Sequence, residues 1–146
     1  FTIESWIYIT KNVTSFIFDW RDVSQGGNQG WMPTLYIERN YITYYAVGSP
    51  RIYSSSISDR LNQWIHVAVV RFGNKTTLYL DGITQGYFND PNSYIGPKDG
   101  NVYIGGSSTG LNFNGYMDDF RITKGVARYT GWGNNFTPPT EALPKY

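Results

Sequence analysis

Short runs of alternating apolar and polar residues recur along the chain, as expected for β-strands that bury one face. In the first run, residues 1–9, the apolar side chains fall on one face of a period-two pattern. Clusters of Gly, Asn, Asp, Ser and Pro separate the runs at a spacing typical of a β-sandwich or barrel. The predicted strands are residues 1–9, 15–20, 35–38, 41–47, 51–57, 64–71, 76–80, 83–87, 101–104 and 116–123.

Four segments carry more specific information. Residues 64–71 are apolar at both parities, which predicts a central strand covered on both faces. Asp81-Gly82 lies between two β-prone runs and predicts a tight hairpin. In the run at residues 15–20, the pattern predicts that Phe16, Phe18 and Trp20 share one side. Residues 124–129 are the one segment predicted to form a helical turn.

Composition narrows the classes of function. Lys plus Arg is 12 and Asp plus Glu is 11, so a net charge of +1 gives no electrostatic footprint for nucleic acid. No apolar run approaches the roughly 18 residues of a membrane span, so membrane insertion is not expected. The chain has no cysteine, which excludes disulfides and cysteine nucleophiles. Aromatic residues make up 18% of the chain, which favours an all-β fold.

Four stretches of sequence together resemble a known family: FTIESWIYI, WIHVAVVRFGNKTTLYLDG, NVYIGG and FNGYMDDFRITKGVARYT. They are similar to laminin-G-like, concanavalin A-like jelly-roll modules, in the subgroup common in bacteriophage particle proteins and large adhesive surface proteins. The resemblance implies a sandwich of two antiparallel sheets, one of them concave. It also implies a further strand before Phe1, so residues 1–146 are expected to be one domain of a longer chain.

Enzymatic activity is not expected. Glycosidases that share this fold place two glutamates around an aspartate on one strand, and this chain contains no such cluster. Asp118 and Asp119 are adjacent on a predicted strand, so their side chains are expected on opposite faces. His66, the one histidine, lies in a nearly continuous apolar strand and is interpreted as a packed core residue.

The resemblance also implies a calcium site, because modules of this family often bind Ca²⁺ through carboxylate, amide and carbonyl oxygens. The candidate ligands are Asp118 or Asp119 with Asn112 and Asn114 of the preceding loop. The alternative is that Asp119 accepts a backbone hydrogen bond in a tight turn.

Carbohydrate binding needs exposed aromatic faces with polar groups beside them. Tyrosines on neighbouring predicted strands, two arginines near them, and loops that could form a rim meet this description. An aromatic-rich chain also places tyrosines in cores and protein contacts, and the sequence leaves both interpretations open. The candidate residues are Tyr41, Tyr44, Tyr45, Tyr53, Arg39, Arg51, Trp31 and Tyr94.

The leading hypothesis is a non-enzymatic module on the surface of a virion, as a capsid decoration or a tail appendage, with weak glycan binding at the host surface. A second hypothesis is a purely structural assembly domain. A third is a carbohydrate-binding module of a secreted enzyme or adhesin, which would be extracellular or attached to a cell surface. The expected partners are other virion proteins, a cell-surface glycan and further copies of the chain as a homo-oligomer.

Overall fold

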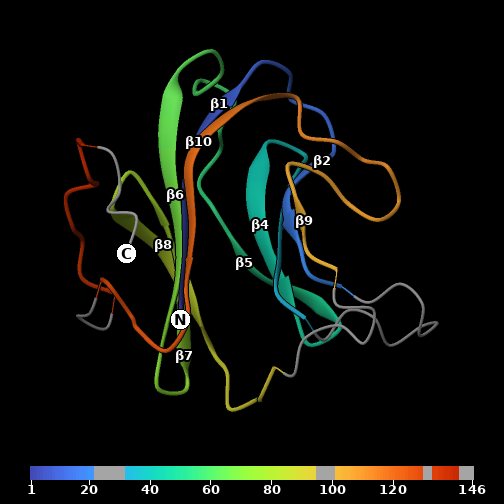
Figure 1. The fold of residues 1–146 in the computed structure, drawn as a ribbon. Helices are drawn as coiled ribbons and strands as arrows, with labels where there is room; N and C mark the ends of the chain where they lie inside the picture. Colours follow the sequence, from blue (N-terminus) through green and yellow to red (C-terminus); the bar gives the residue numbers. More distant parts are fainter. Residues whose placement is uncertain (22–31, 95–100, 130–132, 142–146) are drawn as a thin grey trace.

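The computed structural model describes residues 1–21, 32–94, 101–129 and 133–141. In these residues all regular elements are β-strands, ten in number. They form two five-stranded antiparallel sheets that pack face to face (Figure 1). This confirms the all-β, two-sheet sandwich that the alternating pattern predicts. None of the described residues forms a helix long and apolar enough to cross a membrane.

One sheet, called sheet A, has the strand order β10-β1-β6-β7-β8. Its central strand is β6, which confirms the prediction drawn from the apolar residues at both of its parities. The strands are β1 (Thr2–Ile9), β6 (Trp64–Phe72), β7 (Lys75–Leu80), β8 (Ile83–Asn89) and β10 (Gly115–Thr123).

The other sheet, sheet B, has the order β5-β4-β3-β2-β9. Strands β2 to β5 are neighbours both along the chain and in the sheet. Strand β9, which comes later in the chain, pairs with β2. The strands are β2 (Ser15–Asp19), β3 (Thr34–Glu38), β4 (Tyr41–Ala46), β5 (Ser49–Tyr53) and β9 (Tyr103–Ile104).

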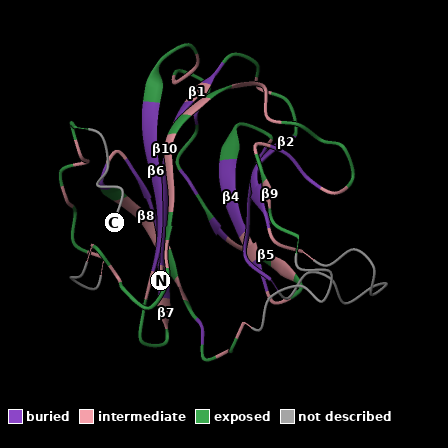
Figure 2. Cartoon of the chain, in the orientation of Figure 1, coloured by how far each residue is buried: buried purple, intermediate pink, exposed green. Residues whose placement is uncertain are grey.

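The hydrophobic core fills the space between the two sheets, where the buried strand residues lie (Figure 2). It is rich in isoleucine, whose branched side chain suits the pleated surface of a sheet. Each fully buried side chain of this size contributes roughly 1.5–3 kcal/mol to stability. The core residues are Ile3, Ile7, Ile9, Ile17, Phe18, Leu35, Ile37, Ile42, Tyr44, Ala46, Ile52, Ile57, Ile65, Val67, Val69, Leu78 and Leu80.

A tight turn joins β7 to β8 at the predicted position. Leu80 pairs with Ile83, and both turn residues are left-handed, with φ of 47° at Asp81 and 74° at Gly82. A Cβ on Gly82 would lie 1.8 Å from the backbone oxygen of Phe136, so both the conformation and the close approach require glycine. The Asp-Gly hairpin prediction is confirmed.

Two local predictions are wrong. Residues 124–129 form bends rather than a helical turn, because they lie against sheet A as an extended cover. In β2 the pairing shifts between Phe16 and Phe18. This bulge leaves Phe18 in the core with Trp20 beside it, while Phe16 stacks on Tyr36 outside it.

The outer face of sheet A is partly covered by residues 124–129 and 133–141, here called the C-terminal segment (Figure 1). Tyr129 and Phe136 of this segment pack on Ala68, Val70 and Tyr79, which form a second small hydrophobic cluster. The two rings of the segment stack with centroids 3.6 Å apart and an interplanar angle of 2°. The outer face of β6 is therefore buried beneath the C-terminal segment.

Candidate functional site

The outer face of sheet B carries a group of aromatic side chains that no described segment covers as the C-terminal segment covers sheet A. Alternation turns Leu35, Ile37, Ile42 and Tyr44 into the core and leaves their neighbours outside. The outward aromatic residues, here called the tyrosine face, are Phe16, Tyr36, Tyr41, Tyr45 and Tyr53.

The rings of the tyrosine face contact one another across four strands. Phe16 and Tyr36 are stacked, with centroids 5.3 Å apart and an interplanar angle of 24°. Tyr36 lies 6.5 Å from Tyr45, and Tyr41 meets Tyr53 edge to face at 6.4 Å. Tyr53 is 55% exposed and Tyr41 39%, so the outer part of the face presents free ring surface.

An ion pair borders the tyrosine face at β2. The carboxylate of Asp19 is fully buried and accepts hydrogen bonds from the Arg21 guanidinium at 2.7 and 2.9 Å. The hydrogen bond to Asp19 raises the pKa of Arg21 above its usual value. The same guanidinium lies over the ring of Phe16 at 4.7 Å, which fixes a cation at the edge of the aromatic surface.

The hydroxyl of Tyr36 lies within electrostatic range of the Glu38 carboxylate at the end of β3. Burial, and then the neighbouring Glu38 carboxylate, raise the pKa of Tyr36 to about 12, so its hydroxyl stays protonated. Thr43 pairs with Tyr36 on one side and Tyr53 on the other. Its buried hydroxyl has no hydrogen-bond partner within the described chain. Ring faces, hydroxyl donors and a carboxylate acceptor together suit the apolar face and the hydroxyl groups of a sugar.

Three of the predicted sugar-binding residues, Tyr41, Tyr45 and Tyr53, lie on the same outer face of sheet B. A fourth, Tyr44, does not. Tyr44 is 1% exposed and belongs to the core, where burial raises the pKa of its hydroxyl. Because consecutive strand residues point to opposite faces, Tyr44 and Tyr45 cannot both be outside. The assumption of an exposed ring at Tyr44 is therefore wrong.

Arg51 also lies away from the tyrosine face. The pairing of β4 and β5 shifts between Tyr44 and Tyr45, and Arg51 is the additional residue on β5. Its guanidinium donates to the backbone oxygens of Ala46 at 2.8 Å and Val47 at 2.5 Å. It also lies 4.7 Å above the ring of Phe88 on β8, in the opposite sheet.

The other predicted residues are dispersed. Arg39 is exposed in the turn between β3 and β4, with a left-handed φ of 51°. Tyr94 lies under the Arg71 guanidinium at 5.0 Å, and its hydroxyl donates to the buried Asp90 carboxylate. Trp31 lies outside the described residues.

The sequence pattern alone did not identify two residues of the tyrosine face, Phe16 and Tyr36. It also did not identify Arg21, which borders the face. For Tyr36 a signal was available, because it has the same parity in its strand as Glu38 and the opposite parity to Leu35 and Ile37. For Phe16 the signal was misleading, since the bulge in β2 moves it to the other side from Phe18.

The proposed calcium ligands do not fit one ion. Asn114 precedes β10 and Asp118 lies four residues further on, which separates them by about 13 Å along an extended strand. Asn112 lies in the loop before β10, where its backbone oxygen accepts from the Asn114 side-chain amide at 3.1 Å. Over the described part of the chain no three His, Cys, Asp or Glu side chains are close enough to hold a metal.

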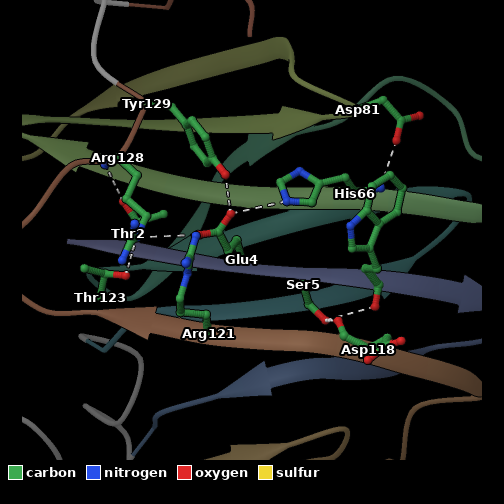
Figure 3. A network of polar contacts seen from close by, with 11 residues as sticks. Thr2, Glu4, Ser5, His66, Asp81, Asp118, Arg121, Thr123, Arg128 and Tyr129 are labelled. Carbon is green, nitrogen blue, oxygen red and sulfur yellow. Dashed lines mark hydrogen bonds and ion pairs between the residues drawn. The ribbon is translucent and has the colours of Figure 1, made fainter. Parts of the chain in front are cut away.

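A buried ionic network lies on the outer face of sheet A, beneath the C-terminal segment (Figure 3). One oxygen of Glu4 accepts hydrogen bonds from Arg121 at 2.9 and 2.6 Å. The other accepts from the Tyr129 hydroxyl at 2.5 Å and lies 3.3 Å from Nε2 of His66. Although burial opposes it, the hydrogen bonds from His66, Tyr129 and Arg121 lower the pKa of Glu4 to about 2.

This network has a structural role. Every acceptor of Glu4 is used, and His66 is fully buried between Trp6 at 5.2 Å and Phe136 at 5.9 Å. Neither side chain is open to a substrate, so the pair is not available for acid–base chemistry. Its contacts hold Tyr129, and with it the C-terminal segment, to the sheet.

Comparison with known families identifies the class of protein. The family model of the concanavalin A-like lectin/glucanases superfamily matches residues 1–128. The chain therefore belongs to this superfamily, and its sandwich is the jelly roll typical of it. None of the curated proteins matches the chain.

Two solved structures share the fold. One is a protein from Bacteroides ovatus named, provisionally, as carbohydrate binding: 22% identity, TM-score 0.66, covering 88% of this chain and 38% of that one. The other is a heptameric SAP-like pentraxin from Limulus polyphemus: 17% identity, TM-score 0.54, covering 82% of this chain and 61% of that one. The chain thus spans less than two thirds of either protein.

Proposed function

We propose that this chain is a non-enzymatic carbohydrate-binding module whose tyrosine face takes up the sugar. The observation that carries the proposal is the gathering of five aromatic rings on one side of sheet B, next to the cation of Arg21 and the carboxylate of Glu38. A group of exposed ring surfaces with polar groups beside them matches the apolar and hydroxyl-bearing surfaces of a saccharide.

Two further observations support this function. The similar protein from Bacteroides ovatus is itself named for carbohydrate binding. Glu4 of β1 is buried and occupied by Arg121 and Tyr129, which supports binding without hydrolysis. The candidate calcium ligands Asp118 and Asp119 belong to β10 of sheet A, so binding at the tyrosine face of sheet B should not depend on them.

The biological setting that we propose is the surface of a virion, where the module forms a capsid decoration or tail appendage and attaches weakly to host glycans. The resemblance of the sequence motifs to bacteriophage particle modules supports this setting. A carbohydrate-binding module of a secreted enzyme or adhesin would use the same face.

The second candidate function is assembly through the same surface. Tyrosine is enriched at protein interfaces, and Tyr53 presents more than half of its surface. The similar pentraxin is heptameric, so a protein with this fold assembles into an oligomer. In this case the tyrosine face would bind other virion proteins or further copies of the chain.

The test is binding of the chain to a panel of bacterial surface polysaccharides, with and without a calcium chelator. The Tyr36→Ala/Tyr53→Ala variant should lose saturable binding, and the chelator should have no effect. Tyr87→Ala is the matched control, because Tyr87 is 58% exposed but lies on β8 of sheet A.

Equal loss in the control variant, or wild-type affinity in the double variant, would contradict the proposed site. Absence of binding to every polysaccharide would favour the assembly function. Analytical ultracentrifugation then decides that case, since an assembly that uses the tyrosine face must dissociate in the double variant.

A further inference from the structure

A hollow of about 530 Å³ lies on the part of sheet A's outer face that the aromatic residues of the C-terminal segment leave open. It is on the opposite side of the sandwich from the tyrosine face. Its residues, here called the tryptophan hollow, are Trp6, Trp64, Asp118, Asp119, Pro139, Thr140 and Glu141.

Two indoles form the apolar part of the hollow. Trp6 pairs with His66 and Tyr8 pairs with Trp64, so the two tryptophans are diagonal neighbours on adjacent strands. Each is held by a ring beside it: Trp6 by His66 at 5.2 Å, and Trp64 by Tyr8 at 5.6 Å, both edge to face. Trp64 is still 46% exposed, so one indole is fixed in place with open surface.

Three carboxylates form the polar part. Asp118 lies opposite Trp6 on β10, and Glu141 comes from the C-terminal segment. Asp119 follows at a bulge in the pairing of β1 with β10 and has a left-handed φ of 49°, so both aspartates line the hollow and the expectation of opposite faces is wrong. No Lys, Arg or His belongs to the described residues that line the hollow. None of the three carboxylates forms an ion pair within the described chain, and the nearby Arg121 is bound to Glu4. The hollow therefore combines aromatic walls with uncompensated negative charge.

We propose that the tryptophan hollow binds ligands that carry a substituted ammonium group, meaning a positively charged nitrogen with apolar substituents. Such a group gains from the indole faces by cation–π attraction and from the carboxylates by charge, and it sheds water easily. A hard divalent cation gains nothing from indoles, because it prefers a shell of oxygen ligands. A neutral sugar leaves the three negative charges without a partner. This site is independent of the glycan site on sheet B.

The experiment is a titration of the ¹⁵N-labelled chain with tetramethylammonium chloride in low-salt buffer. The indole N–H signals of Trp6 and Trp64 should move and saturate together. tert-Butanol, a neutral molecule of similar shape, and sodium chloride at equal ionic strength should not move them. High salt should weaken binding, because the carboxylates are close to solvent.

Variants separate the two contributions. Trp64→Ala should abolish saturation and Trp64→Phe should retain it, while Asp118→Asn/Glu141→Gln should weaken affinity roughly fivefold or more. Tyr53→Ala, on the opposite face, should bind as the wild type does, and unfolding in urea should show that each variant is folded.

Equal response to tert-butanol, unchanged affinity in Asp118→Asn/Glu141→Gln, or no saturable shift in the wild type would each overturn the proposal. Polysaccharide binding by the Trp64→Ala variant is measured in parallel. It should be unchanged, so failure of the ammonium site and failure of the glycan site are distinguishable.

Discussion

The outer faces of the two sheets arise from the same alternating pattern of residues, but they differ in how far their side chains are buried. On sheet A, the outward side chains of β1 and β6 include Glu4 and His66, which are buried because the C-terminal segment covers them. On sheet B, the outward side chains include Tyr41 and Tyr53, which remain exposed.

The difference separates structural aromatic residues from those that are available to a ligand. Tyr129 and Phe136 stack on each other and on sheet A, so their surface is used in folding. The rings of the tyrosine face contact one another, and Tyr41 and Tyr53 leave part of their surface in water, although Phe16 is buried. An aromatic-rich composition alone cannot distinguish these two uses. The distinction arises because the C-terminal segment covers the outer face of sheet A in part.

The largest expected effect is on the covered face. Glu4→Ala leaves Arg121 without its buried partner and should lower the free energy of unfolding by about 3–5 kcal/mol. Glu38→Ala is the matched change on the open face and should cost less than about 1 kcal/mol. Urea unfolding measures both, and equal effects would contradict the distinction between the faces.

The next effect concerns the cover itself. Phe136→Ala removes the ring that stacks on Tyr129 and contacts Tyr79 at 5.1 Å, so it should cost about 2–4 kcal/mol and release the C-terminal segment locally. Hydrogen exchange should be faster in the variant at the backbone amide of residue 136, which in the wild type donates to the backbone oxygen of Gly82. Unchanged exchange would show that other contacts hold the segment.

The alternating pattern predicted much of the fold. The central position of β6 and the hairpin at Asp81-Gly82 follow from local signals, namely apolar residues at both parities and a turn dipeptide. The bulges could not be predicted, because a bulge depends on how a strand registers with its partner. The bulge in β2 is the reason why Phe16 and Phe18 were placed on the same side.

The candidate site was predictable only in part. Tyr41, Tyr45 and Tyr53 share a face, while Tyr44 has the opposite parity to Tyr45, so strict alternation would have excluded it. The tryptophan hollow could not be predicted from the parity of residues in single strands. Trp6 and Trp64 become neighbours only through the register of β1 with β6, and single-strand patterns do not contain that information.

Acid should destabilise the covered face. The pKa of Glu4 is lowered to about 2 from the model-compound value of 4.5, so its ionised form stabilises the folded state. This contribution is complete above pH 4.5 and is lost as the pH falls from 4.5 toward 2. Unfolding free energies measured across this range should decrease in the wild type, and the decrease should be shallower in Glu4→Gln. An equal decrease in the variant would assign acid sensitivity to other groups.

The smallest effect on stability is expected on the open face. Tyr45→Ala should change the free energy of unfolding by no more than about 1 kcal/mol and weaken polysaccharide binding roughly tenfold. Tyr44→Ala, one residue away in the core, should instead cost about 3–5 kcal/mol. Calorimetry and binding assays on this adjacent pair compare the two faces of β4 directly, and a reversed order would contradict the assignment.

The central claim is that the tyrosine face is the ligand surface, and mapping the bound sugar tests it most directly. The ¹⁵N-labelled chain is titrated with oligosaccharide fragments of the polysaccharide that binds most tightly. We predict saturable shifts concentrated on β2, β3, β4 and β5, at Phe16, Tyr36, Tyr41, Tyr45 and Tyr53. Shifts concentrated on the strands of sheet A, with these five residues unmoved, would contradict the account.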